Sequence, residues 1–271
     1  MLKTRDSSYR PAFTWAASRV TGTAHETSGE ACQDALTLRA GRCDGVPFLT
    51  AAVADGAGSA TFAEEASRLA TRMFTDFVAS EISGWGLDGL DDLALDAIYG
   101  VHCKLRRLAV ERGVHPDHFA TTLLGVVATA ERTVLVQIGD GGIVMGSPWG
   151  PPWRLAFTPQ HGEYRNESRF ISDSDAMDHL QQTSFDGPPG TLVMFTDGLE
   201  DLLLDPFSYA VHTPLFDRVG SELAEHRERG LHKRLSADLF DLMSGGSVRS
   251  RTNDDTTLLT IRFDGGLNDG L

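Results

Sequence analysis

The sequence is poor in cysteine and in basic residues, and it contains no long apolar run. Its 271 residues include three cysteines, Cys32, Cys43 and Cys103, none of them in a CxxC pair. An odd count without such pairs argues against a disulfide framework or a structural zinc site. No apolar run approaches the roughly 18 residues of a transmembrane helix. The first ten residues also lack the apolar core of a signal peptide. We therefore expect a cytoplasmic protein that does not bind membranes.

The charge balance excludes further classes of function. Lys plus Arg total 24 and Asp plus Glu total 38, which gives a formal net charge of -14. Nucleic-acid binding needs a basic surface, and anionic membranes attract basic segments, so the chain is expected to bind neither. The acidic excess either serves solubility alone or is relieved locally by bound cations at a site for an anionic substrate. Composition leaves both readings open.

Hydrophobic periodicity predicts the secondary structure. Strands are expected at 13–20, 35–39, 48–54, 120–130, 132–138, 142–145, 153–157, 191–196 and 256–263. One helix is expected after Thr61 and Glu64, which have capping-box spacing. A second runs over 90–108 with Gly113 as its stop, and 206–243 is mostly helical. This order is not the βαβ alternation of a parallel sheet. It predicts an α+β protein with helices packed on largely antiparallel sheets.

The length fits one large domain or two small ones. We expect a flexible N-terminus over 1–10, a single domain over 11–265 and a tail over 266–271. The polar, Asp- and Ser-rich stretch from His161 to Pro189 reads as irregular. It predicts a flap at about 147–190 that governs the choice of substrate.

Aspartates at the ends of predicted strands are the main chemical signal. Asp55, Asp140 and Asp197 each follow an apolar run and precede a glycine. A single Asp-Gly pair is typical of a turn. Central strands of one core end close together, however, so three carboxylates there would repel unless protons or cations intervene. Aspartates without His or Cys neighbours suit Mg²⁺ or Mn²⁺. Asp34 and Asp254 add acidic groups before the second and the last strand.

Six motifs in order resemble the PPM, or type 2C, serine/threonine protein phosphatases, and in particular a bacterial branch of that family. They are CQDA (32–35), VADGAGSA (53–60), ATTLL (120–124), IGDGG (138–142), FTDGLED (195–201) and NDDTTLL (253–259). The resemblance spans almost the whole chain. It implies a four-layer α-β-β-α sandwich, with two mainly antiparallel sheets flanked by helix pairs. The order of predicted strands and helices agrees with this independently.

The resemblance also implies metal ligands. Asp55 would bridge two ions, and the carbonyl of Gly56 would bind one of them. Asp197 and Asp254 would hold the second ion, and Asp140 matches an aspartate that helps to bind a third ion in many bacterial members. The implied cofactors are two or three ions of Mn²⁺ or Mg²⁺.

The implied reaction is hydrolysis of phosphoserine or phosphothreonine by in-line attack of a metal-bridging hydroxide, without a phosphoenzyme. Asp34 would be a ligand or an acceptor for metal-bound water, which makes Asp34 and Asp55 catalytic residues. Thr121 and Thr122 match a structural pair of the family.

One position departs from the family pattern. Many members carry an arginine before the first acidic motif that grips the phosphate with a bidentate fork. His25 stands in the matching place here, and Arg19 lies nearby but out of register. His25 would serve as a catalytic general acid or as a weaker phosphate anchor, or it is an ordinary loop residue. Substrate affinity and preference depend on which role it has.

Two other functions compete with an active phosphatase. The chain could be a catalytically weak regulatory domain that binds a phosphorylated partner, or another two-metal enzyme such as a nuclease. The presence of all four core acids, Asp34, Asp55, Asp197 and Asp254, favours activity. The acidic charge argues against a nuclease. We expect a phosphorylated protein substrate, with a Ser/Thr kinase or its targets as partner.

Overall fold

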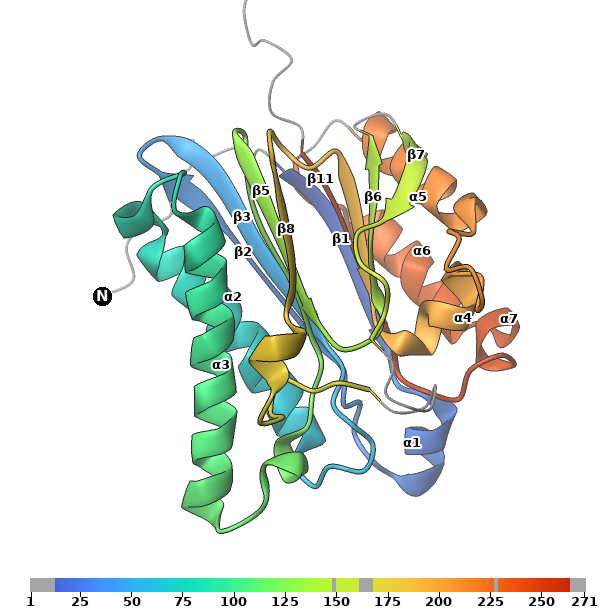
Figure 1. The fold of residues 1–271 in the computed structure, drawn as a ribbon. Helices are drawn as coiled ribbons and strands as arrows, with labels where there is room; N and C mark the ends of the chain where they lie inside the picture. The colour runs from blue at the N-terminus through green and yellow to red at the C-terminus, as the bar shows by residue number, and fades with distance from the viewer. Residues whose placement is uncertain (1–12, 148–149, 161–167, 227–228, 264–271) are drawn as a thin grey trace, which may run out of the picture.

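The computed structural model describes residues 13–147, 150–160, 168–226 and 229–263. Two sheets face one another at the centre, and helices cover the outer face of each (Figure 1). The predicted flexible N-terminus (1–10) and C-terminal tail (266–271) lie outside the described residues. Within the described ranges, no helix has the length and apolar character needed to cross a membrane.

The first sheet is antiparallel throughout and has the strand order β2-β3-β4-β5-β8. Its strands are β2 (Ala35–Cys43), β3 (Val46–Ala54), β4 (Leu123–Thr129), β5 (Arg132–Ile138) and β8 (Gln181–Asp186). Two long helices, α2 (Ala63–Trp85) and α3 (Leu90–Arg112), cover its outer face.

The second sheet has the order β10-β1-β11-β9-β6-β7 and is antiparallel except where β10 pairs with β1. Its strands are β10 (Gly230–Leu231), β1 (Phe13–Val20), β11 (Thr256–Phe263), β9 (Thr191–Phe195), β6 (Gly142–Ser147) and β7 (Gly150–Leu155). The helices α5 (Thr213–Glu225) and α6 (Lys233–Ser244) cover its outer face. The predicted four-layer α+β sandwich is therefore confirmed.

Short helical segments complete the structure around one end of the sheets. They are α1 (Thr23–Ser28), α4 (Glu200–Leu203), α7 (Gly246–Arg249) and the 3-10 turns η1 (Pro116–Phe119), η2 (Ala176–His179) and η3 (Asp197–Leu199). At this end, α1 lies between β1 and β2, residues 55–62 join β3 to α2, and η3 follows β9.

Strand β3 shows why the layers form. Phe48 and Ala52 belong to the core under α2 and α3, whereas Leu49, Ala51 and Val53 belong to the core between the two sheets. Successive side chains of a strand point to opposite faces. A continuous apolar run is therefore required in a strand that is buried on both sides.

Several local predictions differ from the structure. The predicted capping box is wrong: α2 has Phe62 as its N-cap, and the Thr61 hydroxyl contacts His118 Nδ1 at 2.7 Å instead. The stretch read as irregular contains strand β8, whose polar sequence QQTSFD has no apolar alternation. Residues 148–149 and 161–167 of the predicted flap lie outside the described residues. The predicted end of the helix at Gly113 is confirmed. This glycine is the C-cap of α3, and its backbone has the left-handed conformation, with a φ of 68°.

Candidate active site

The antiparallel registers bring the predicted acidic positions to one end of the sandwich. Ala35 at the start of β2 is paired with Ala54 at the end of β3, so Asp34 and Asp55 leave the sheet together. In the other sheet Leu258 pairs with Phe195, which places the start of β11 beside the end of β9. Asp254 and Asp197 therefore also meet at this end.

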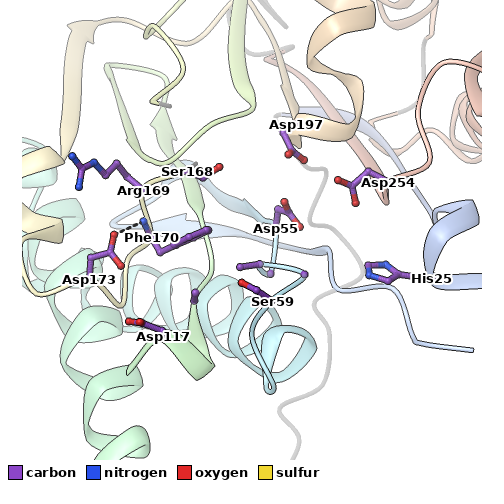
Figure 2. A pocket seen from close by; sticks show the side chains of 14 residues that line it. His25, Asp55, Ser59, Asp117, Ser168, Arg169, Phe170, Asp173, Asp197 and Asp254 are labelled. Atoms are coloured by element: carbon purple, nitrogen blue, oxygen red, sulfur yellow. Dashed lines mark hydrogen bonds between the residues drawn. The ribbon is translucent and has the colours of Figure 1, made fainter. Parts of the chain in front are cut away.

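A cavity of about 820 Å³ opens between these strand ends. Asp55, Gly56, Asp197, Asp254 and His25 are among the residues that line it. Figure 2 shows the carboxylates of Asp197 and Asp254 converging on that of Asp55, with His25 beside them. Three strand ends and helix α1 thus contribute to a single pocket.

Backbone contacts hold Asp55 in place. Its N–H donates to the Thr122 hydroxyl at 2.9 Å, and its carbonyl accepts from the Thr121 hydroxyl and the Thr122 N–H, each at 2.8 Å. At Gly56, an added Cβ would lie 2.5 Å from the carbonyl oxygen of Ala63. The turn after β3 therefore requires glycine here, and the two threonines have the structural position that the family resemblance implies.

Asp34 is fully buried immediately behind the pocket. Its Oδ2 accepts hydrogen bonds from the hydroxyls of Thr196 at 2.8 Å and Thr257 at 2.7 Å. Burial raises the pKa of Asp34 to about 7, although the two hydroxyls oppose this shift. The side chain therefore has a fixed orientation and a proton affinity near neutrality.

The carboxylates repel one another strongly. Burial raises the pKa of Asp55 well above its usual value, and four acidic neighbours raise it further: Asp197, Asp34, Asp254 and Asp140. The pKa of Asp197 is raised in the same way, by burial first and then by Asp140, Asp254 and Asp34. Such a cluster is stable only with protons or cations bound.

Asp140 lies on the glycine-rich turn after β5, behind the lining of the pocket. It is 4% exposed, and its Oδ2 accepts a hydrogen bond from the Ser168 hydroxyl. Gly141 next to it has a φ of 76°, and its N–H donates to Glu200 Oε2 at 3.1 Å. The turn thereby joins the end of the first sheet to α4 in the second half of the molecule.

His25 is fixed by a buried carboxylate, that of Asp255. Nδ1 of His25 lies 2.9 Å from Asp255 Oδ2, and the same carboxylate accepts from the backbone N–H groups of Gly22 at 2.7 Å and Gln33 at 2.6 Å. Burial lowers the pKa of His25, but the hydrogen bond and charge of Asp255, with Asp254 and Glu30, outweigh burial and raise it. Arg19 does not take part, because its guanidinium donates to the Asp34 carbonyl at 2.7 Å.

The residues present fit hard divalent cations. One oxygen each of Asp34 and Asp197 is buried without a hydrogen-bond partner. Carboxylate oxygens with no histidine or cysteine among them suit Mg²⁺ or Mn²⁺. In the described part of the chain, no three acidic, histidine or cysteine groups already adopt the arrangement of a formed metal site.

Several residues of the site were missed by sequence reasoning. Asp255 stood beside Asp254 in the NDDTT motif, but nothing local separates the inward from the outward carboxylate. Thr196 and Thr257 flank predicted strand ends and carry no chemical signature alone. Ser168 fell in the stretch interpreted as a flap. Only tertiary contacts reveal these four positions.

Comparison with known proteins agrees with this geometry. A family model described as protein phosphatase 2C matches residues 21–239. The chain is 33% identical over 238 residues to serine/threonine-protein phosphatase 3 of Escherichia coli (strain K12), an alignment covering 88% of this chain and 93% of that protein.

Solved structures share the fold. The serine/threonine phosphatase of S. agalactiae matches with a TM-score of 0.63 at 16% identity, over 92% of this chain and 99% of that chain. RsbX, solved in complex with magnesium, matches with a TM-score of 0.52 at 15% identity, over 91% and 93%. The family model and the E. coli relative cover most of the chain, so this protein belongs to the protein phosphatase 2C family and is a serine/threonine phosphatase.

Proposed function

We propose that the pocket hydrolyses phosphoserine and phosphothreonine in protein substrates, using Mn²⁺ or Mg²⁺ held by its carboxylates. The observation that carries this proposal is the convergence of Asp34, Asp55, Asp197 and Asp254 from four strand ends, with two of their oxygens buried and unpartnered. The family is metal-dependent, and a phosphatase of this type acts on phosphoproteins. The identity and number of the ions are part of the proposal.

The proposal assigns the predicted metal ligands to individual ions. Asp55 and the Gly56 carbonyl would hold one ion, and Asp55, Asp197 and Asp254 a second. Asp140, anchored by Ser168, would support a third. Bound ions would supply Lewis-acid activation of water and neutralise the phosphoryl oxygens.

Asp34 is the proposed proton acceptor for the attacking water. Its Oδ2 is engaged by two hydroxyls, whereas its Oδ1 is buried without a hydrogen-bond partner, so Oδ1 is the oxygen left to accept the proton. Burial raises the pKa of Asp34 to about 7, which suits a general base that works near neutrality.

His25 is the proposed proton donor to the leaving serine or threonine oxygen. Since Asp255 accepts at Nδ1, the Nε2 atom is left to carry the transferable proton. The role of phosphate anchor, usual for the family arginine, is weaker for a single imidazole than for a bidentate guanidinium. We extend the proposal to one catalytic domain over 11–265, with the flap at 147–190 selecting substrates of a Ser/Thr kinase.

Hydrolysis of p-nitrophenyl phosphate and of a phosphothreonine peptide tests the proposal. We expect turnover with Mn²⁺ or Mg²⁺ and none in EDTA. Asp55→Asn and Asp197→Asn should each lower kcat by about 100-fold or more, because each removes a charged ligand. Asp96→Asn, which removes an exposed carboxylate of α3 outside the pocket, is the matched control and should retain the parent rate. Activity within a few-fold of the parent in either site variant would refute the assignment. Phosphopeptide binding without turnover would instead indicate a regulatory module.

A further inference from the structure

The pocket extends beyond the residues that the proposed reaction uses. Its side away from His25 is formed by Asp117, Arg169, Phe170 and Asp173, which we call the distal wall. Figure 2 shows these side chains across the pocket from Asp197 and Asp254, with Asp55 between the two groups. Because the substrates are phosphoproteins, the cavity must admit residues that flank the phosphorylated one, and the distal wall borders the space left for them.

Asp173 is the rigid member of the distal wall. Its Oδ2 accepts from the Phe170 N–H at 2.9 Å, and its own N–H donates to the Phe170 carbonyl at 3.1 Å. Burial raises the pKa of Asp173, and the charges of Asp175 and Asp117 raise it further. The two wall carboxylates, Asp117 and Asp173, therefore lie close enough to repel one another.

Within the distal wall, the positive charge of Arg169 lowers the pKa of Asp173, but burial and the charges of Asp175 and Asp117 outweigh it. Arg169 places its guanidinium 3.8 Å from Asp175, and in Figure 2 this side chain extends away from Asp55. Asp117 contacts His115 Nδ1 at 3.0 Å, but the two side chains are 75% and 73% exposed, and exposed pairs of this kind contribute little. The wall thus presents two carboxylates to a bound polypeptide.

Phe170 adds an apolar surface between these carboxylates and the rest of the site. It packs against the buried cluster of Ala60, Ala63 and Ala120, is half-buried, and lines the cavity with the rest of its side chain. Lysine and arginine side chains combine an apolar stem with a charged head, and arginine also stacks on aromatic faces. The Phe170 ring suits the apolar stem of such a side chain, and the two carboxylates suit its charged head.

Resting on the proposed function, we propose that the distal wall is a specificity subsite for a lysine or arginine that flanks the phosphorylated residue of the substrate. Asp173 and Asp117 bind the charged head, and Phe170 contacts the stem. The phosphate and the basic side chain then occupy opposite sides of one cavity.

Three phosphothreonine peptides of equal length test the subsite. One carries arginine two residues before the phosphothreonine, one carries it two residues after, and the third has alanine at both positions. We expect one of the arginine peptides to exceed the alanine peptide in kcat/KM by about five- to tenfold at low ionic strength. Asp117→Asn and Asp173→Asn should each reduce that ratio by about three- to fivefold, the scale of one partly exposed ion pair. The amide that replaces the Asp173 carboxylate retains an oxygen that can accept from the Phe170 N–H, so the turn should be preserved.

The controls separate this subsite from the proposed chemistry. Asp96→Asn should keep the parent ratio, and salt should lower the ratio in the parent because exposed charges are screened. Equal kcat/KM for all three peptides, or an unchanged ratio in both wall variants, would overturn the subsite while p-nitrophenyl phosphate turnover upheld the phosphatase. If the parent hydrolysed nothing, the chemistry would fail separately. Fluorescence anisotropy with the same peptides would then support the subsite if arginine tightened binding in the parent only, and equal affinities would overturn it.

Discussion

Neighbouring residues of one motif have opposite environments at the mouth of the pocket. Asp254 is exposed and lines the cavity, whereas Asp255 is 1% exposed and turns inward. Asp255 joins three separate segments, since it accepts from the loop before α1, from His25 and from the chain before β2. It positions the histidine without lining the pocket itself.

Asp255→Ala should lower the free energy of unfolding by about 3 kcal/mol. The change leaves two buried backbone N–H groups and the His25 ring without their acceptor, and each lost partner of this kind costs about 1–3 kcal/mol. Urea unfolding in EDTA measures the loss independently of metal. Asp96→Ala on the exposed face of α3 should change stability by no more than about 0.5 kcal/mol. A loss below about 1 kcal/mol for Asp255→Ala would contradict the anchoring role.

Asp55→Asn should stabilise the metal-free protein while it removes activity. Burial and four acidic neighbours disfavour the charged form of Asp55, and asparagine keeps the shape without the charge. We expect the free energy of unfolding in EDTA to rise, because the substitution removes a buried charge that its acidic neighbours repel. Thermal unfolding at neutral pH in EDTA measures it. A lower midpoint than the parent would show that the carboxylate is not under repulsion.

At the scale of elements, the 3-10 turn η3, which follows β9, sets the position of Asp197. An added Cβ on Gly198 would lie 2.0 Å from the carbonyl oxygen of Asp255. The backbone at Gly198 therefore packs directly against the backbone of Asp255, the residue before β11. This close approach, rather than a need for flexibility, explains the glycine that follows Asp197. It also couples the two strands that carry Asp197 and Asp254.

Gly198→Ala should therefore impair both stability and catalysis. We expect a loss of about 2 kcal/mol in unfolding free energy, because backbone must shift to admit the methyl group. A lower kcat should accompany it as Asp197 moves. Gly100→Ala in α3, where a Cβ meets nothing within 4 Å, is the matched control and should stabilise by about 0.5–1 kcal/mol. Denaturant unfolding that showed the same sign for both substitutions would argue against the close approach.

At the scale of the whole molecule, the site lies where the two halves of the sandwich meet. Asp34, Asp55 and Asp140 leave strands of the first sheet, whereas Asp197 and Asp254 belong to strands of the second. A cation bound among them would link both sheets. Cation binding should therefore stabilise the whole fold rather than one loop.

Mn²⁺ should raise the thermal midpoint of the parent, and EDTA should reverse the change. At a free concentration 100 times the dissociation constant, a ligand of the native state alone stabilises by about 2.7 kcal/mol. Asp197→Asn should shift by much less, since it removes a ligand from the second sheet. Differential scanning calorimetry at fixed protein concentration compares them. An equal shift in both proteins would place the responsible ion elsewhere.

The strands of the core followed from local pattern. The runs at 48–54 and 191–196 matched β3 and β9 closely, because a strand buried on both faces must be apolar throughout. Strand β8 was not predicted, because it lies at the edge of its sheet, where the polar side chains of QQTSFD stay partly exposed. Helix α1 was not predicted either, because its six residues bury none of their side chains and so show no apolar periodicity.

By itself, the sequence determined the order of strands and helices through periodicity, and the acidic strand ends and the family through motifs. The resemblance to the family then implied the layered fold. The tertiary structure alone decided which carboxylates face the cavity, that Asp255 holds His25, and that Asp117 and Asp173 share a wall with Phe170. These relations join residues far apart in the chain. Their energies depend on the register and packing of whole sheets, which no local window of residues contains.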